Sequence, residues 1–218
     1  MTNDKSYNYI ILAKTMTQAA IFPTVTFDEF IAWYPENSEN RYELHRGVIV
    51  EMPKPKGKHS AIAGFLGLEI GLQCRQRQLP YFVPRECVVR SLSAESGYEP
   101  DIIVLDHQEV SKEPRWEAES IITMGSSVRL IVEVVSTNWR VDYMTKAADY
   151  EEMGISEYWI IDYLGLGGRR FIGNPKQPTI SVYQLVEGEY QISQFRGNNP
   201  IESTAFPELN LTAEQIFA

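Results

Sequence analysis

The order of the predicted elements favours an α/β (α+β) fold in which a mixed β-sheet is flanked by helices. Two observations support this prediction. Short apolar runs rich in β-branched residues, such as Leu130–Val135, are typical of strands that are buried on both faces. Segments with helical periodicity stand between these runs, so that the chain reads as helix, hairpin, helix, several strands, helix and strands.

Length and composition indicate a globular protein. The chain has 218 residues, enough for one domain with a substantial core, and its 44% hydrophobic and 22% charged content is ordinary for a soluble protein. We predict an irregular N-terminal leader at residues 1–23 and a single domain at residues 24–218. No apolar stretch approaches the roughly 20 residues of a membrane span, and we find no signal peptide. We therefore expect a cytoplasmic protein with no membrane partner.

Charge and cysteine usage exclude some classes of function. The formal net charge of −9 argues against a broad nucleic-acid-binding face, but it is compatible with a local basic groove. The two cysteines, Cys74 and Cys87, give no disulfide framework, and no Cys/His cluster has the spacing of a zinc site.

The N-terminal part of the domain is predicted to form a helix and a hairpin. Thr26 and Glu29 have the spacing of a capping box, and they open a short helix that Pro35 stops. Residues 41–52 alternate between polar and apolar side chains around Gly47, which indicates a hairpin with its turn at the glycine.

The middle of the chain begins with a loop of sequence KPKGK, which contains Lys54, Lys56 and Lys58. A helix with an apolar face is expected from His59 to about Arg77. The remaining predictions, in chain order, are strands at 82–90 and 102–105, an irregular charged region at 107–127, a strand at 130–135, a helix at 142–153 closed by Gly154, a strand at 157–162, a turning segment at 165–178, a hairpin with strands at 180–186 and 190–195, and a short closing helix at 211–217.

One acid interrupts an apolar strand. Glu133 stands where a buried strand would carry another aliphatic side chain, and Glu is almost never fully buried without a partner. An uncompensated carboxylate there would cost several kcal/mol or take up a proton. Glu133 therefore needs a cation, a hydrogen-bond network or a place at the mouth of a cleft. The simplest alternative is a strand edge or an ordinary salt bridge.

Three acids occupy predicted strand positions: Glu43, Asp101 and Glu133. Asp101 follows Pro100, which marks the end or edge of a strand. Carboxylates are the ligands that Mg²⁺ takes in proteins, and a metal held in this way can activate water and stabilise charge on a phosphodiester. The three acids are therefore candidate metal ligands of a site for phosphoester hydrolysis.

A lysine follows on the next predicted helix. Asp142, Lys146 and Tyr150 share one helical face, which a strand-to-helix turn could bring back over Glu133. Lys146 would then bind a phosphate or position a water molecule. The plainer interpretations are that Asp142 caps the helix, that Lys146 makes surface ion pairs, and that Tyr150 lies in the core. The two isolated histidines, His45 and His59, are assigned no chemical role.

Taken together, these motifs resemble those of a known family. Tyr42-Glu43-Leu44 with Gly47, His59, Pro100-Asp101, Glu133 to Ser136, Asp142, Lys146, Tyr150 and the segment GISEYWIID at 154–162 are similar to the putative restriction endonuclease family (Uma2-like, a domain of unknown function) of the PD-(D/E)XK nuclease superfamily. The resemblance covers the chain from about Thr24 to its end. It implies a restriction-endonuclease-like core, with the N-terminal helix and hairpin and the C-terminal hairpin as additions.

The resemblance also implies roles for individual residues. Asp101 and Glu133 would be the metal-binding acids of the superfamily, and Glu43 the additional acid from the early part of the core. The usual lysine would stand two residues after Glu133, where this chain has Val135. Lys146 matches branches of the superfamily in which the lysine has moved to the following helix.

We therefore expect a Mg²⁺- or Mn²⁺-dependent DNA endonuclease. Glu43, Asp101 and Glu133 would bind the metal, and Lys146 would position water or phosphate. The three loop lysines, Lys54, Lys56 and Lys58, would contact the DNA backbone. By analogy with enzymes that cut both strands, we expect a homodimer.

Two alternatives use the same chain differently. The first is a non-catalytic binding or assembly protein that keeps a nuclease-like fold. The acidic balance and the aromatic segments around Trp116, Trp139 and residues 180–195 support it. The second is a metal-dependent hydrolase of a phosphoester that is not a nucleic acid.

Overall fold

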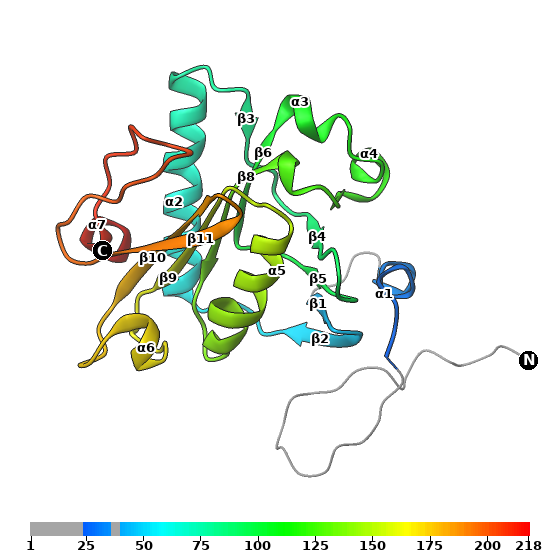
Figure 1. The fold of residues 1–218 in the computed structure, drawn as a ribbon, viewed down its shortest axis with the longest axis horizontal. Helices are drawn as coiled ribbons and strands as arrows, with labels where there is room; N and C mark the ends of the chain where they lie inside the picture. Colours follow the sequence, from blue (N-terminus) through cyan, green and yellow to red (C-terminus); the bar gives the residue numbers. More distant parts are fainter. Residues whose placement is uncertain (1–23, 36–39) are drawn as a thin grey trace, which may run out of the picture.

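The computed structural model describes residues 24–35 and 40–218, so the predicted leader at 1–23 lies outside the described residues. The chain forms a mixed α/β structure with two mixed sheets flanked by helices (Figure 1). The predicted fold class is confirmed. The sequence did not predict that the strands would divide between two sheets.

The larger sheet has six strands in the order β11-β10-β9-β8-β6-β3. Only β8 and β9 pair in parallel, and the other neighbours are antiparallel. The bounds of these strands are β3 (Tyr81–Phe82), β6 (Ile102–Asp106), β8 (Val128–Val134), β9 (Glu157–Asp162), β10 (Thr179–Val186) and β11 (Glu189–Phe195). The crossover between β8 and β9 carries the helix that completes the site described below.

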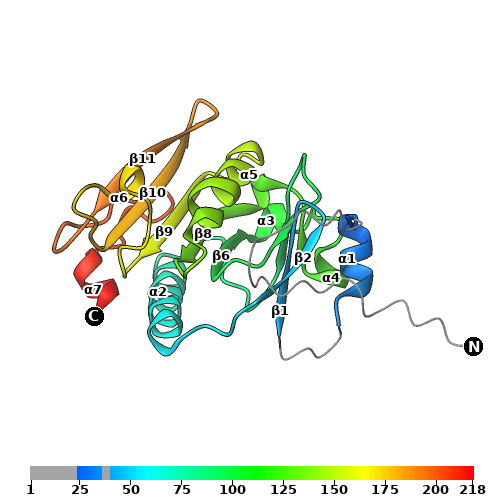
Figure 2. The same cartoon turned by 90° about the horizontal axis from the view of Figure 1, so that it is seen from below.

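Helices cover both faces of the larger sheet (Figure 2). Side chains alternate along a strand, so Leu130, Val132 and Val134 of β8 point to the face under α2 (Gly57–Gln76). Ile131 and Glu133 point to the opposite face, which is covered by a π-helix (Val141–Lys146) and by α5 (Ala147–Glu152). This alternation aims Glu133 at the helix that carries Lys146.

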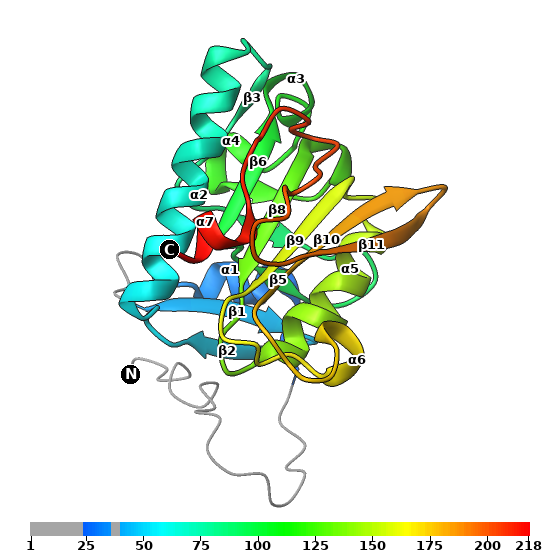
Figure 3. The same ribbon diagram turned by 90° about the vertical axis from the view of Figure 1, so that its left-hand side faces the viewer.

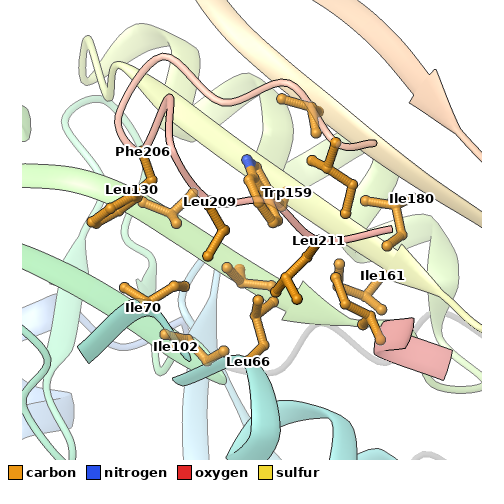
Figure 4. Packing of buried hydrophobic residues seen from close by; sticks show 14 of the residues in the cluster. Leu66, Ile70, Ile102, Leu130, Trp159, Ile161, Ile180, Phe206, Leu209 and Leu211 are labelled. Atoms are coloured by element: carbon orange, nitrogen blue, oxygen red, sulfur yellow. The ribbon is translucent and has the colours of Figure 1, made fainter. Parts of the chain in front are cut away.

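The core under α2 is closed by the C-terminal segment (Figure 3). Leu66 and Ile70 of α2 pack against sheet residues that include Trp159, and the segment that leads to α7 (Ala213–Phe217) adds Phe206 and Leu211 (Figure 4). All five side chains are buried. The apolar surface that they remove from water fixes α2 against the sheet.

The smaller sheet forms the other end of the molecule (Figure 2). Its strands lie in the order β2 (Val48–Met52), β1 (Arg41–His45), β5 (Gly97–Tyr98), β4 (Val88–Arg90) and β7 (Ile121–Ile122). The predicted β1–β2 hairpin is confirmed, and Arg46 and Gly47 in its turn both have positive φ, as a two-residue turn of this hand requires. α1 (Phe27–Trp33) packs Phe27 and Phe30 on this sheet, and the predicted capping box is present.

Several local predictions were wrong. The single strand predicted at 82–90 is instead the end of β3 and a separate strand β4, which belong to different sheets and flank Pro84. The helix predicted at 142–153 is present at 141–152, but its first part is a π-helix. Short helices interrupt two segments predicted to be irregular or turning: α3 (His107–Val110), α4 (Trp116–Glu119), the 3-10 turn at Gly125–Ser127 and α6 (Arg169–Ile172). In the part of the chain that the structure describes, no helix has the length and apolarity to cross a membrane.

A buried acid ties the C-terminal segment to the sheet. Glu157 of β9 is completely buried, and its carboxylate accepts hydrogen bonds from the Trp159 indole and from Ser203, Thr204 and Ala205. Five donors converge on these two oxygens, so the charge is fully solvated by the protein.

We expect Glu157→Gln to lower the free energy of unfolding by about 1.5–3 kcal/mol, because the amide turns an NH₂ group toward groups that themselves donate. Urea denaturation measures the change. Glu202→Gln, at an exposed acid in the same segment, is the matched control and should change it by less than about 0.5 kcal/mol. Equal effects of the two variants would contradict the role given to Glu157.

Candidate active site

The four residues proposed from the sequence come from three structural units and line one cavity. Glu43 lies on β1 of the smaller sheet, Asp101 just before β6, Glu133 on β8 and Lys146 at the end of the π-helix. The cavity has a volume of about 210 Å³. Its walls include the segment 52–56 after β2 and residues of the loop at 163–166 after β9.

The ammonium of Lys146 lies between the two most deeply buried acids of the cavity. Nζ is 2.9 Å from Glu43 Oε1 and 2.9 Å from Glu133 Oε1, and it is 3.9 Å from Asp142 Oδ1. The lysine side chain is only 3% exposed, so these contacts are almost free of competing water. Tyr150 donates a further hydrogen bond to Glu133 Oε1. The partner that Glu133 requires is thus a cation from the following helix.

Asp101 occupies the more open side of the cavity. Its Oδ2 accepts a hydrogen bond from the Val134 amide at 2.8 Å, which locks the carboxylate against the end of β8. His59 Nε2 is 3.3 Å from the same oxygen, and Arg41 Nη1 is 3.8 Å from Oδ1. Asp101 is therefore held by its neighbours on two strands and a helix, while part of it faces the cavity.

Burial and charge push the pKa values of the two deepest acids in opposite directions. Burial alone would raise the pKa of Glu43, but Lys146 and His45 lower it to about 2. Burial raises the pKa of Glu133 well above its usual range, and repulsion from Asp101, Asp142 and Glu43 adds to this against the attraction of Lys146. Glu43 is thus the ionised partner of the lysine, whereas the raised pKa of Glu133 favours its protonated form.

The same crowding affects two groups on the π-helix. Burial raises the pKa of Asp142 to about 7, and the nearby Glu43 and Asp101 add to the shift. Burial would lower the pKa of Lys146, but Glu133, Glu43 and Asp142 together raise it well above its usual range. The lysine therefore stays charged between the two carboxyl groups.

The π-helix has a direct bearing on this geometry. A helix with i→i+5 hydrogen bonds holds one more residue per turn locally, and such turns are frequent at functional sites. Here it contains both Asp142 and Lys146, and both side chains are buried against the sheet. Helical periodicity predicted that these residues share a face but could not show the wider turn.

The loop lysines do not lie together. Lys54 and Lys56 line the cavity, whereas the Nζ of Lys58 donates a hydrogen bond to the Ala218 carbonyl at 2.7 Å. Only the first two are therefore placed to meet a phosphate that enters the cavity.

Sequence reasoning missed two residues that line this cavity. His59 belongs to α2, three and seven residues before the buried Ile62 and Leu66, and this spacing was the available signal that it faces the sheet. Bonding to Asp101 raises the pKa of His59 against the opposing effect of burial, and its Nδ1 is buried without a hydrogen-bond partner. Arg41, at the mouth, pairs with Glu99 at 2.9 Å.

The aromatic residues that suggested a binding surface are mostly packed. Trp116 lies against Phe82, and Trp139 lies against Tyr143 and Phe171. Both tryptophans are half-buried. In the hairpin, by contrast, Ile192 of the edge strand β11 is 53% exposed.

The arrangement of the acidic side chains in the cavity bears on whether the cavity could hold a metal ion. Among the described residues, no group of three or more His, Cys, Asp and Glu side chains is arranged to hold one. The reason is visible at Lys146, whose ammonium stands between Glu43 and Glu133. The chemistry of the donors nevertheless suits a hard divalent cation, because Asp101, Glu133 and Asp142 line one cavity and carboxylate oxygens are the ligands that such a cation takes.

Comparisons with known proteins identify the family and the fold. A family profile named Uma2, with the description "Putative restriction endonuclease", matches residues 27–214. A solved structure described as "a putative nuclease belonging to DUF820" from Anabaena variabilis ATCC 29413 matches with a TM-score of 0.68 and 22% sequence identity, over 88% of this chain and 97% of that chain. At this identity the likeness shows a shared fold. No curated protein matches.

We expect Lys146→Met to lower the free energy of unfolding by roughly 3–5 kcal/mol, because it leaves buried carboxylates without their cation. Adding Glu133→Gln in the same chain should restore part of the loss. Chemical denaturation monitored by circular dichroism measures both.

Lys112→Met provides the control, since this lysine makes only an exposed pair with Glu109 and such pairs contribute about 0–1 kcal/mol. A Lys146→Met protein as stable as the Lys112→Met protein would show that the ammonium is not what holds the carboxylates together.

Proposed function

The chain belongs to the Uma2 family, which carries the description "Putative restriction endonuclease", and on this basis we propose that it is a nuclease that hydrolyses the phosphodiester bonds of DNA. One observation supports this assignment above the others. Glu43, Asp101, Glu133 and Lys146, which lie far apart in the sequence, line a single cavity with two further lysines at its wall.

We further propose that the reaction depends on Mg²⁺ or Mn²⁺. Asp101 and Glu133 would hold the cation, because both carboxyl groups lie at the end of β8. A cation there would also stabilise the ionised form of Glu133, which burial disfavours. A bound divalent cation supplies an activated water and neutralises charge on the phosphate. Glu43, which was predicted as a third ligand, is instead engaged by Lys146 and His45 and would act by holding the lysine.

The remaining residues would orient the substrate. Lys146 keeps its charge in the buried site, so it can donate hydrogen bonds to a phosphate oxygen or to the attacking water at the cavity floor. Arg41, whose side chain is 38% exposed at the mouth, has a guanidinium suited to a second phosphate oxygen. Lys54 and Lys56 would meet the flanking phosphates.

A binding or assembly protein is the second candidate, and one surface supports it. β11 is an edge strand of the larger sheet, and most of its residues are exposed, Ile192 among them. An exposed strand edge is a template for pairing with another chain. The same edge is compatible with the homodimer that we propose for the nuclease by analogy.

We expect the protein to nick supercoiled plasmid at low salt in Mg²⁺ or Mn²⁺ but not in EDTA. Asp101→Asn should lower the rate by roughly 100-fold or more, because it weakens an electrostatic contact made in the transition state. Gel electrophoresis of time courses measures the rates.

Glu214→Gln, at an exposed acid of α7 outside the cavity and the β11 edge, is the matched control and should cut like the unchanged protein. Cleavage that persists at full rate in Asp101→Asn would place the chemistry elsewhere. Absence of cleavage under every metal condition would favour the binding protein.

Metal binding should also raise the melting temperature, because a ligand that binds only the folded state stabilises it. At a Mn²⁺ concentration of 100 times Kd the gain is about 2.7 kcal/mol, or roughly 5–10 °C for a chain of this size. Differential scanning fluorimetry at constant ionic strength measures the shift. An equal shift in Asp101→Asn would show that the stabilising metal binds at another place.

A further inference from the structure

The acids of the proposed site lie at the floor of a narrow cavity. The Asp101 side chain is 12% exposed and the Glu133 side chain 6% exposed. The volume of about 210 Å³ is below the roughly 300–1,000 Å³ of pockets that enclose a drug-sized ligand. Whatever phosphate reacts there must reach between the loop at 52–56 and the loop at 163–166.

This depth restricts the form of the substrate. A phosphodiester can react only where it reaches Asp101 and Glu133, and an intact double helix presents its backbones on the outside of a stiff, wide rod. A cavity of this size cannot admit such a rod. A strand without its complement is flexible and can bend one phosphate into the floor while its bases turn elsewhere.

A second, larger groove opens beside the cavity. Its volume is about 1180 Å³, and it shares Arg41, Lys54 and Glu99 with the first. Its walls also carry the half-buried aromatic residues Tyr34 and Trp116. The two spaces therefore adjoin at these residues, with the acids lining one and the aromatic side chains lining the other.

The charges along this groove nearly cancel. Arg41 lies 2.9 Å from Glu99, and Arg85 lies 3.2 Å from Glu86. The third acid of the wall, Glu119, pairs with Arg115. Three basic residues, Arg41, Lys54 and Arg85, therefore stand beside the aromatic faces of the groove, and its balanced charge is compatible with the net charge of −9.

We infer that the substrate is single-stranded DNA, which enters along this groove and stacks bases on Trp116 while one phosphodiester reaches Asp101 and Glu133. This inference rests on the proposed nuclease function. Aromatic side chains beside basic residues are how proteins hold unpaired strands without reading their sequence. Arg85 is 92% exposed, and it adds a stacking or phosphate contact at the outer end.

Fluorescence anisotropy in EDTA at low salt tests binding, with a labelled thymidine 12-mer and a 12-base-pair duplex as probes. We expect the single strand to bind at least 10-fold more tightly than the duplex. Trp116→Ala should weaken its binding by roughly 10-fold, and Trp116→Phe should retain most of it. Arg85→Ala should weaken it several-fold, whereas Arg75→Ala, at an exposed arginine of α2 outside the groove, should not.

Cleavage in Mn²⁺ separates the two proposals, with a single-stranded circle and a relaxed double-stranded circle as substrates. Faster cutting of the single-stranded circle supports the inference. Equal cutting and equal binding of both forms overturns it and leaves the nuclease in place. Cutting of neither circle overturns the nuclease. Because Trp116 packs on Phe82, the melting temperature of each variant is measured. If Trp116→Ala unfolds, the binding of Arg85→Ala decides the test, since the exposed Arg85 can be replaced without loss of packing.

Discussion

The buried ammonium of Lys146 is the contact on which the site depends. It joins Glu43 of the smaller sheet to Glu133 of the larger sheet, and it reaches both from the crossover helix. Removing the Lys146 ammonium and the Glu43 carboxylate from water is costly, and only their mutual attraction and hydrogen bonds offset that cost. The cavity therefore exists because two sheets and one helix meet at a single cation, and each fixes the position of the others.

The architecture explains why the acids can be both buried and reachable. β8 and β6 present Glu133 and Asp101 near one end of the larger sheet, while β1 closes the site from the side with Glu43. The smaller sheet thus serves as one wall of the cavity, and α1 stabilises that wall through the aromatic cluster around Phe27 and Phe30. Residues at the far end of the molecule contribute to the site through packing.

The fold class and the need of Glu133 for a partner could be predicted from the sequence. The predictions that were wrong or incomplete have physical causes. Glu133 demanded a partner because its strand is apolar, and the fold class followed from the order of elements. His59 and Arg41 were missed because their bond to Asp101 forms only when α2 and β1 meet the strand that follows it. The strand predicted at 82–90 split because Pro84 interrupts an apolar run whose two halves suit different sheets.

Val135 stands where the resemblance to the nuclease superfamily would place the usual lysine. It is 1% exposed and belongs to the apolar cluster under α5, so the position next to the acids serves packing instead of chemistry. The acids are thereby carried on strands and the cation on a helix. An engineer who wished to retune the electrostatics of the site could replace side chains of one helical turn, together with the acids that they contact, without rebuilding the apolar packing of the strand.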